Sequence, residues 1–100
     1  MEPAHTILIL DGNVVTHKCV LESASVFIKD GKISAVGKKT ARKARITIDA
    51  RGCLVAPGMV DIHIHGAGGV FLGKTIQQDL MILSRVLARR GVTSFLITIG

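Results

Sequence analysis

Residues 57–66, with the sequence Pro-Gly-Met-Val-Asp-Ile-His-Ile-His-Gly, constrain the fold of this chain more than any other stretch. Apolar and polar residues alternate from position 60 to position 65, which predicts a β-strand with two unlike faces. One face is apolar and β-branched, as in a strand packed under helices. The other face carries a carboxylate and two imidazoles, so the two faces are Val60, Ile62 and Ile64 against Asp61, His63 and His65.

His63 and His65 are candidate metal ligands. In a strand, residues i and i+2 share a face with Cα atoms about 6.5–7 Å apart. Two neutral imidazoles at that spacing can converge on one ion at Zn–N distances of about 2.0–2.1 Å. A structural pair of hydrogen-bonded histidines is an equal alternative, because zinc normally takes three or four protein ligands. No third ligand is evident, since the other two histidines lie far back in the chain and the two cysteines are not spaced as ligands.

The apolar content of the chain is high for its size. Its 100 residues suffice for one domain or for a piece of a larger one. An apolar fraction of 48% and a mean hydropathy of +0.47 exceed what a small soluble domain normally shows. No apolar run is long enough to span a membrane, so part of this surface is expected to be buried against protein outside the chain.

The net charge of +6 is concentrated between residues 29 and 51. A basic stretch can attract nucleic acid, but the chain has no Trp or Tyr and only three Phe that could stack on bases. A solvated basic loop is therefore favoured. Cys19 and Cys53 fit no metal or redox spacing and indicate reduced thiols, hence the cytoplasm. The start of the chain has no signal-peptide pattern.

Residues 1–56 are predicted to form a small all-β unit. A turn is expected at residues 11–13, Asp-Gly-Asn, between a strand at 6–10 and another at 14–21. Asp30 and Gly31 predict a type I′ hairpin turn, because both residues accept positive φ angles. The predicted strands are too few to close a sandwich by themselves.

Residues 57–100 are predicted to form one βαβ unit. After the first strand come a glycine-rich loop at 66–69 and a helix whose start is marked by a capping box of Thr75 and Gln78. The helix is expected to end at Gly91, a C′ glycine that follows two arginines. Residues 92–99 predict a buried parallel strand, which needs further strands beside it.

Nucleotide binding is a competing interpretation of the glycine-rich loop. The stretch from Gly68 to Thr75 satisfies the phosphate-loop pattern GxxxxGK(S/T), and it follows a strand and precedes a helix. However, Val70, Phe71 and Leu72 are bulky where a loop around phosphates favours small or polar residues. The strand after the helix also ends without the Asp that would hold Mg²⁺. The metal interpretation is therefore favoured, and nucleotide binding is the alternative.

The run from Val55 to Gly66 resembles the first barrel strand of the amidohydrolase superfamily, whose members carry a PGxxDxHxH signature after a small N-terminal β domain. The loop at residues 65–69, His-Gly-Ala-Gly-Gly, is similar to that of the N-acetylglucosamine-6-phosphate deacetylase branch. Residues 91–96, Gly-Val-Thr-Ser-Phe-Leu, are similar to the second barrel strand of the same branch. The alternative is a cyclic-amide amidohydrolase of the dihydroorotase or dihydropyrimidinase kind, which usually has a different loop after the histidines.

The resemblance implies an α/β fold in two parts. Residues 1–56 would be the N-terminal strands of a small β-sandwich domain, and residues 57–100 the first βαβ segment of an incomplete (β/α)8 (TIM) barrel. His63 and His65 would be metal ligands at the C-terminal end of a barrel strand. The implied ion is zinc, with iron, cobalt, manganese or nickel as alternatives. The implied reaction is metal-assisted hydrolysis of N-acetylglucosamine 6-phosphate to glucosamine 6-phosphate and acetate.

The family's other catalytic groups come from later barrel strands: a Glu and two His as ligands, a catalytic Asp and the basic residues that bind phosphate. The chain stops after the second strand of eight, so the resemblance assigns it no catalytic residue and predicts little turnover from it alone. Asp61 is interpreted as a structural, hydrogen-bonding carboxylate. The expected partner is a small amino-sugar phosphate rather than nucleic acid or a membrane, and the complete protein is expected to be a cytoplasmic homodimer.

Overall fold

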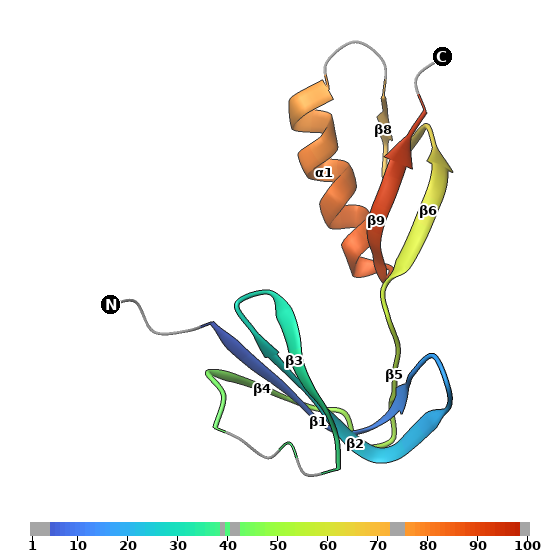
Figure 1. Ribbon diagram of the computed structural model, residues 1–100. Helices are drawn as coiled ribbons and strands as arrows, with labels where there is room; N and C mark the ends of the chain where they lie inside the picture. The colour runs from blue at the N-terminus through green and yellow to red at the C-terminus, as the bar shows by residue number, and fades with distance from the viewer. Residues whose placement is uncertain (1–4, 39, 41–42, 73–75, 99–100) are drawn as a thin grey trace. The chain divides into compact units, whose positions relative to one another are not determined.

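The computed structural model describes residues 5–38, 40, 43–72 and 76–98. The chain divides into two compact units, Met1–Pro57 and Gly58–Gly100. Strands predominate, and the helix of the described residues is α1 (Ile76–Arg89) (Figure 1). No helix in these ranges is long and apolar enough to cross a membrane.

The first unit is a five-stranded sheet made of β1 (Thr6–Val15), β2 (Val20–Lys29), β3 (Lys32–Gly37), β4 (Ile46–Asp49) and β5 (Leu54–Val55). The strand order is β3-β2-β1-β4, and β5 also pairs with β1 (Figure 1). β1, β2 and β3 are antiparallel neighbours, whereas β4 and β5 run parallel to β1. The described residues of this unit therefore form one sheet, and the sandwich implied by the resemblance stays a prediction.

The expected turn at residues 11–13 is wrong, because β1 continues through it. The register of β1 against β2 shifts on both sides of Gly12, and Asp11 has a φ of 57°. The amide of Asp11 donates to Ser25 Oγ at 3.1 Å. These residues thus form a β-bulge. Strand neighbours on both sides, β2 and β5, keep the segment within the sheet.

The hairpin predicted at Asp30 and Gly31 is confirmed. These two residues join β2 to β3, and Lys29 pairs with Lys32 across the turn. Their φ angles are 50° and 77°, the positive values that a type I′ turn requires. The Asp30 carboxylate also accepts a hydrogen bond from the amide of His5 at 3.0 Å.

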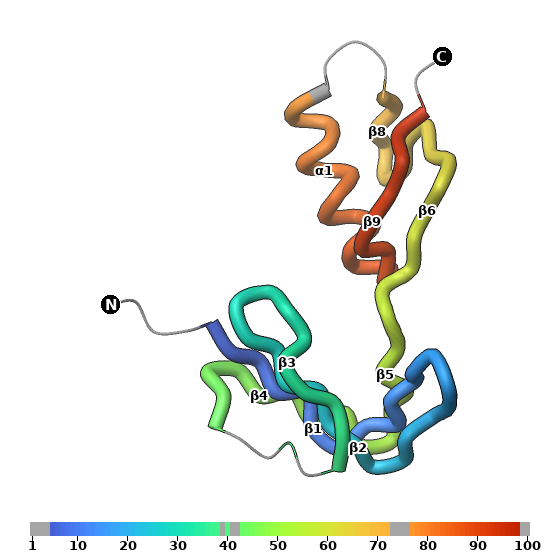
Figure 2. Tube along the Cα trace, viewed as in Figure 1, coloured from blue at the N-terminus to red at the C-terminus, as the bar shows by residue number. Residues whose placement is uncertain are grey.

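The second unit is a βαβ unit with a small hairpin inserted before the helix. Its strands are β6 (Met59–Ile64), β7 (Gly66–Ala67), β8 (Val70–Phe71) and β9 (Val92–Ile97). β6 and β9 are parallel, as predicted, and β7 and β8 form the antiparallel hairpin. Figure 2 follows the chain from β6 through β8 to α1 and back along β9. The complete barrel stays a prediction.

The helix ends where the sequence predicted. Gly91 has a φ of 84°, and its amide donates to the carbonyl oxygen of Ala88 at 3.0 Å, as at a C′ glycine. The capping box predicted at the start involves Thr75, which lies outside the described residues. The core of the unit consists of Ile64, Leu72, Leu83 and Leu87.

Within the described residues, β6 buries one residue of its predicted apolar face, and cover of the rest by protein outside this chain stays a prediction. Ile64 is 9% exposed, but Val60 and Ile62 are 63% and 75% exposed. On β9, which pairs with β6 in a two-stranded sheet of the described residues, Leu96 is 62% exposed, in agreement with the expectation that this strand needs further strands beside it. The helix α1 packs over β9 and the β7–β8 hairpin, and from β6 the side chain of Ile64 joins the core. A register shift between Asp61 and Ile64 also interrupts the regular alternation of β6.

Candidate metal centre

The two histidines predicted as ligands lie together at the C-terminal end of β6. His63 is in the strand and His65 follows its last residue. Their ring centroids are 5.0 Å apart and the ring planes are inclined by 80°. Both side chains are exposed. The strand conformation expected from the sequence thus puts the two imidazoles side by side.

A β-bulge shapes the backbone at His63. Asp61 pairs with Phe95 and Ile64 with Ile97, so two residues of β6 lie between these pairs where β9 has one. The amide of His63 donates to Oδ1 of Asp61 at 3.1 Å. The carboxylate therefore supports a backbone group at the bulge, in agreement with the structural role expected for Asp61.

The ring of His63 has a hydrogen-bonding partner on the neighbouring strand. Its Nδ1 lies 3.2 Å from Oγ1 of Thr98, which directly follows β9. The amide of Thr98 donates to the carbonyl oxygen of Ile64 at 2.8 Å and so extends the pairing of the two strands. The sequence reasoning missed Thr98. A polar residue at the C-terminal end of the second parallel strand was the available signal, because side chains at those ends meet at one edge of a sheet.

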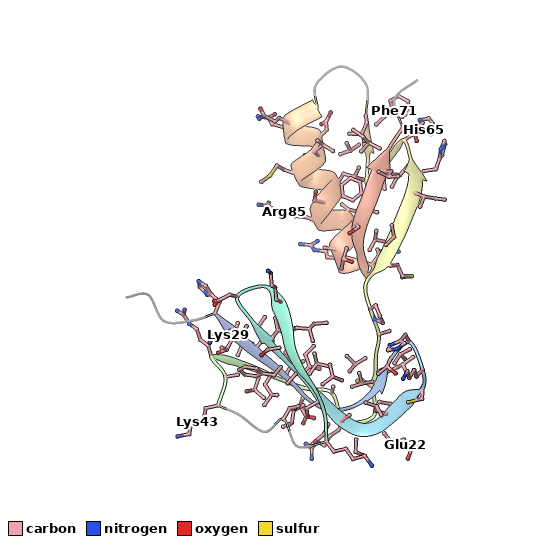
Figure 3. The ribbon with its side chains drawn as sticks, in the orientation of Figure 1. Glu22, Lys29, Lys43, His65, Phe71 and Arg85 are labelled. Carbon is pink, nitrogen blue, oxygen red and sulfur yellow. The ribbon has the colours of Figure 1, made fainter. Side chains whose placement is uncertain are left out.

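His65 is held by the β7–β8 hairpin. Its carbonyl oxygen accepts a hydrogen bond from the amide of Leu72 at 2.8 Å. Its ring stacks on that of Phe71, with centroids 6.3 Å apart and planes inclined by 7°; Figure 3 shows the two side chains next to each other. Gly66 has no space for a side chain, because a Cβ there would clash with the carbonyl oxygen of Val70.

The hairpin also bears on the nucleotide-binding alternative. Gly68 and Gly69 form its turn with φ angles of 61° and 83°. Leu72 is 1% exposed in the core, and its amide is already bonded to His65. These positions are therefore used for packing and pairing rather than for a loop open to phosphate. The rest of the motif, residues 73–75, lies outside the described residues.

The separation of the two histidine rings is compatible with a shared metal ion. An imidazole nitrogen lies about 1.1 Å from its ring centre, so two rings bound to one tetrahedral ion at about 2.0–2.1 Å have centroids about 5 Å apart. The observed separation of 5.0 Å matches this value. In the part of the chain that the structure describes, no group of three or more His, Cys, Asp or Glu residues could hold an ion. The described residues thus offer two nitrogen ligands, and metal binding itself stays a prediction.

Comparison with known proteins gives a consistent family. The chain is 39% identical to the N-acetylglucosamine-6-phosphate deacetylase of Bacillus subtilis (strain 168) over 98 residues, which are 95% of this chain and 24% of that protein. It is 40% identical to an allantoinase of Bacillus licheniformis over 77 residues, 75% of this chain and 16% of the relative. It is 35% identical to a dihydroorotase of Streptococcus pneumoniae serotype 4 over 89 residues, 88% of this chain and 20% of the relative. The chain belongs to the amidohydrolase superfamily.

Solved structures agree with this assignment. The L-hydantoinase of Arthrobacter aurescens resembles this amidohydrolase chain with a TM-score of 0.53 and 37% identity, over 59% of this chain and 13% of that one. The ochratoxinase of A. niger has a TM-score of 0.61 over 94% of this chain and 25% of that one, and at 17% identity it shows likeness of fold alone. None of the models of known protein families matches the chain. The chain spans about a quarter or less of the length of these relatives.

Proposed function

We propose that this chain is the N-terminal portion of a metal-dependent amidohydrolase that converts N-acetylglucosamine 6-phosphate and water to glucosamine 6-phosphate and acetate. The observation that carries the proposal is the proximity of the His63 and His65 rings, whose centroid separation of 5.0 Å is compatible with two ligands of one ion. The deacetylase reaction in particular is supported by 39% identity to the Bacillus subtilis deacetylase over 95% of the chain.

The residues of this chain would bind and orient the ion. A divalent ion, with zinc as the expected one, supplies polarisation of the amide carbonyl and a lowered pKa for the attacking water. His63 and His65 would hold it through neutral imidazole nitrogens, and both side chains are exposed where a substrate can reach them. The hydrogen bond to Thr98 and the stacking on Phe71 restrict the two rings before the ion binds.

A cyclic amide is the second candidate substrate. It is favoured by 40% identity to an allantoinase and 37% identity to an L-hydantoinase. Both substrate classes contain an amide bond that the same metal chemistry would hydrolyse. Assays of the full-length protein with N-acetylglucosamine 6-phosphate, allantoin, dihydroorotate and hydantoin distinguish them. Activity confined to the cyclic amides would refute the deacetylase assignment.

A reducing compartment is part of the proposal. Cys19 and Cys53 are both free and exposed, which suits the cytoplasm, where thiols are kept reduced. Dimerisation of the complete protein stays a prediction from the resemblance.

Metal analysis of the full-length protein tests the ligand assignment. The double variant His63→Ala with His65→Ala should lose tight metal uptake, because two of the ligands disappear together. The matched control is His5→Ala with His17→Ala, which removes two exposed histidines of the first unit and should leave the metal content unchanged. Equal metal content in the wild type and the His63/His65 variant would refute the proposal.

A further inference from the structure

We propose that Thr98 is a positioning residue for the metal centre: its hydroxyl holds Nδ1 of His63, so that Nε2 is the nitrogen presented to the ion. The inference rests on the proposed function, because it requires His63 to be a ligand. Its geometric basis is the distance of 3.2 Å between Oγ1 of Thr98 and Nδ1 of His63, two side chains that are 35 residues apart in the sequence.

A backbone hydrogen bond to β6, the strand that carries His63, fixes the position of Thr98. Its amide donates to the carbonyl oxygen of Ile64 at 2.8 Å, one residue beyond the last ladder pair of Ile64 and Ile97. Ile64 lies between the two histidines and its side chain is in the core. Thr98 is therefore hydrogen-bonded to Ile64, the core residue that lies between His63 and His65.

The side chain of Thr98 is suited to holding a ring in one orientation. Threonine is β-branched and has few χ1 rotamers, so the direction of its hydroxyl is restricted. A hydroxyl group can both donate and accept a hydrogen bond. It can therefore accept the proton of Nδ1 when the metal takes the lone pair of Nε2.

This arrangement leaves one nitrogen of His63 for a metal ion. A neutral imidazole has a proton on one nitrogen and a lone pair on the other. Because Oγ1 of Thr98 occupies Nδ1, Nε2 is the nitrogen left for the ion; a ring bound through Nε2 has its proton on Nδ1, which then donates to Thr98, and the ring cannot turn without losing this hydrogen bond. Hydrogen-bonding partners of ligating histidines typically contribute about 10–100-fold to metal affinity. The ring of His65 is supported differently, by stacking on Phe71.

The experiment measures zinc affinity of the full-length protein by competition with a chelator. Thr98→Val keeps the shape and removes the hydroxyl, so it should bind zinc about 10–100-fold more weakly. Thr98→Ser restores the hydroxyl and should recover most of the affinity. The matched control is Thr93→Val on β9, an exposed threonine whose replacement should leave the affinity unchanged. Wild-type affinity in Thr98→Val, or equal losses in Thr98→Val and Thr93→Val, would overturn the proposal.

A spectroscopic readout keeps the proposal testable even if a variant fails to fold. Nitrogen-15 NMR of the zinc-loaded wild type should show His63 with a proton on Nδ1 and the metal on Nε2. Ligation through Nδ1 of His63 would overturn the inference without any substitution. The His63→Ala and His65→Ala double variant separates the two levels: undiminished zinc binding there refutes the proposed function, whereas lost binding there with wild-type affinity in Thr98→Val refutes only the role of Thr98.

Discussion

Replacing Ile64 with alanine tests the packing of the βαβ unit, and the same replacement at Ile62 is its matched control. Ile64 is 9% exposed and belongs to the core with Leu72, Leu83 and Leu87. Ile62, two residues earlier on the same strand, is 75% exposed. Both variants lose the same carbon atoms and the same β-branch from β6, so the difference between them isolates the effect of burial.

The expected magnitudes follow from the two exposures. An isoleucine-to-alanine change in a packed core costs about 2–5 kcal/mol, because a cavity adds to the lost burial, and we expect about 3 kcal/mol for Ile64→Ala. Ile62 has a quarter of its surface covered and leaves no cavity, so Ile62→Ala should cost about 0.5 kcal/mol. The difference of about 2.5 kcal/mol is roughly a 70-fold change in the unfolding equilibrium constant.

Urea unfolding of the 100-residue chain, followed by far-UV circular dichroism, measures the effect, since the chain has no Trp or Tyr for fluorescence. Hydrogen exchange then assigns the loss to the second unit. The amide of Thr98, which donates to Ile64, should lose protection in Ile64→Ala and keep it in Ile62→Ala. Equal losses of stability in the two variants would refute the reasoning, because they would mean that Ile62 is packed as tightly as Ile64 within these 100 residues.

Two further substitutions test the hairpin and the charged surface. Gly66→Ala should disrupt the β7–β8 hairpin, because its Cβ would clash with the carbonyl oxygen of Val70, and NMR shifts of the His65 ring should change; unchanged shifts would contradict the geometry. The hydrogen bond from the Arg51 side chain lowers the pKa of Asp49 below its ordinary value of 3.8, and Arg51→Ala should raise it again in an NMR titration. Because the folded-state pKa is the lower one, the stability from this pair is present above the unfolded pKa and is lost as the pH falls through the folded value. A pKa of Asp49 that does not move in the variant would show that the pair does not form in solution.

Some residues of the candidate site could be predicted from the sequence, and others could not. The histidines could be found from the sequence because alternate residues of a strand share a face and His63 and His65 are two residues apart. The bulge at His63 and the end of β6 before His65 are details that this pattern does not contain. Their supports could not be found in this way. Thr98 is 35 residues from His63, and its contact depends on the register of β6 against β9, which two bulges shift.

Local conformational preferences determined one part of this fold from the sequence alone. Asp30 and Gly31 both accept positive φ, so they specify their hairpin without help from distant residues. Gly91 ends the helix for the same kind of reason. The order of strand, helix and strand in the second unit likewise follows from periodicity and capping, which are local properties.

The tertiary structure decided which side chains are covered. Alternation predicts two faces for β6 but cannot say where a helix docks, and within the described residues α1 packs over β9 and the hairpin, with Ile64 in the core beneath it. Residues 11–13 are a second case in which distant strands decide the local structure. Their sequence is typical of a turn, but they form a bulge because β2 and β5 pair with β1 on its two sides. Burial and strand pairing depend on interactions between segments that are distant in the sequence. A local sequence pattern therefore cannot predict them.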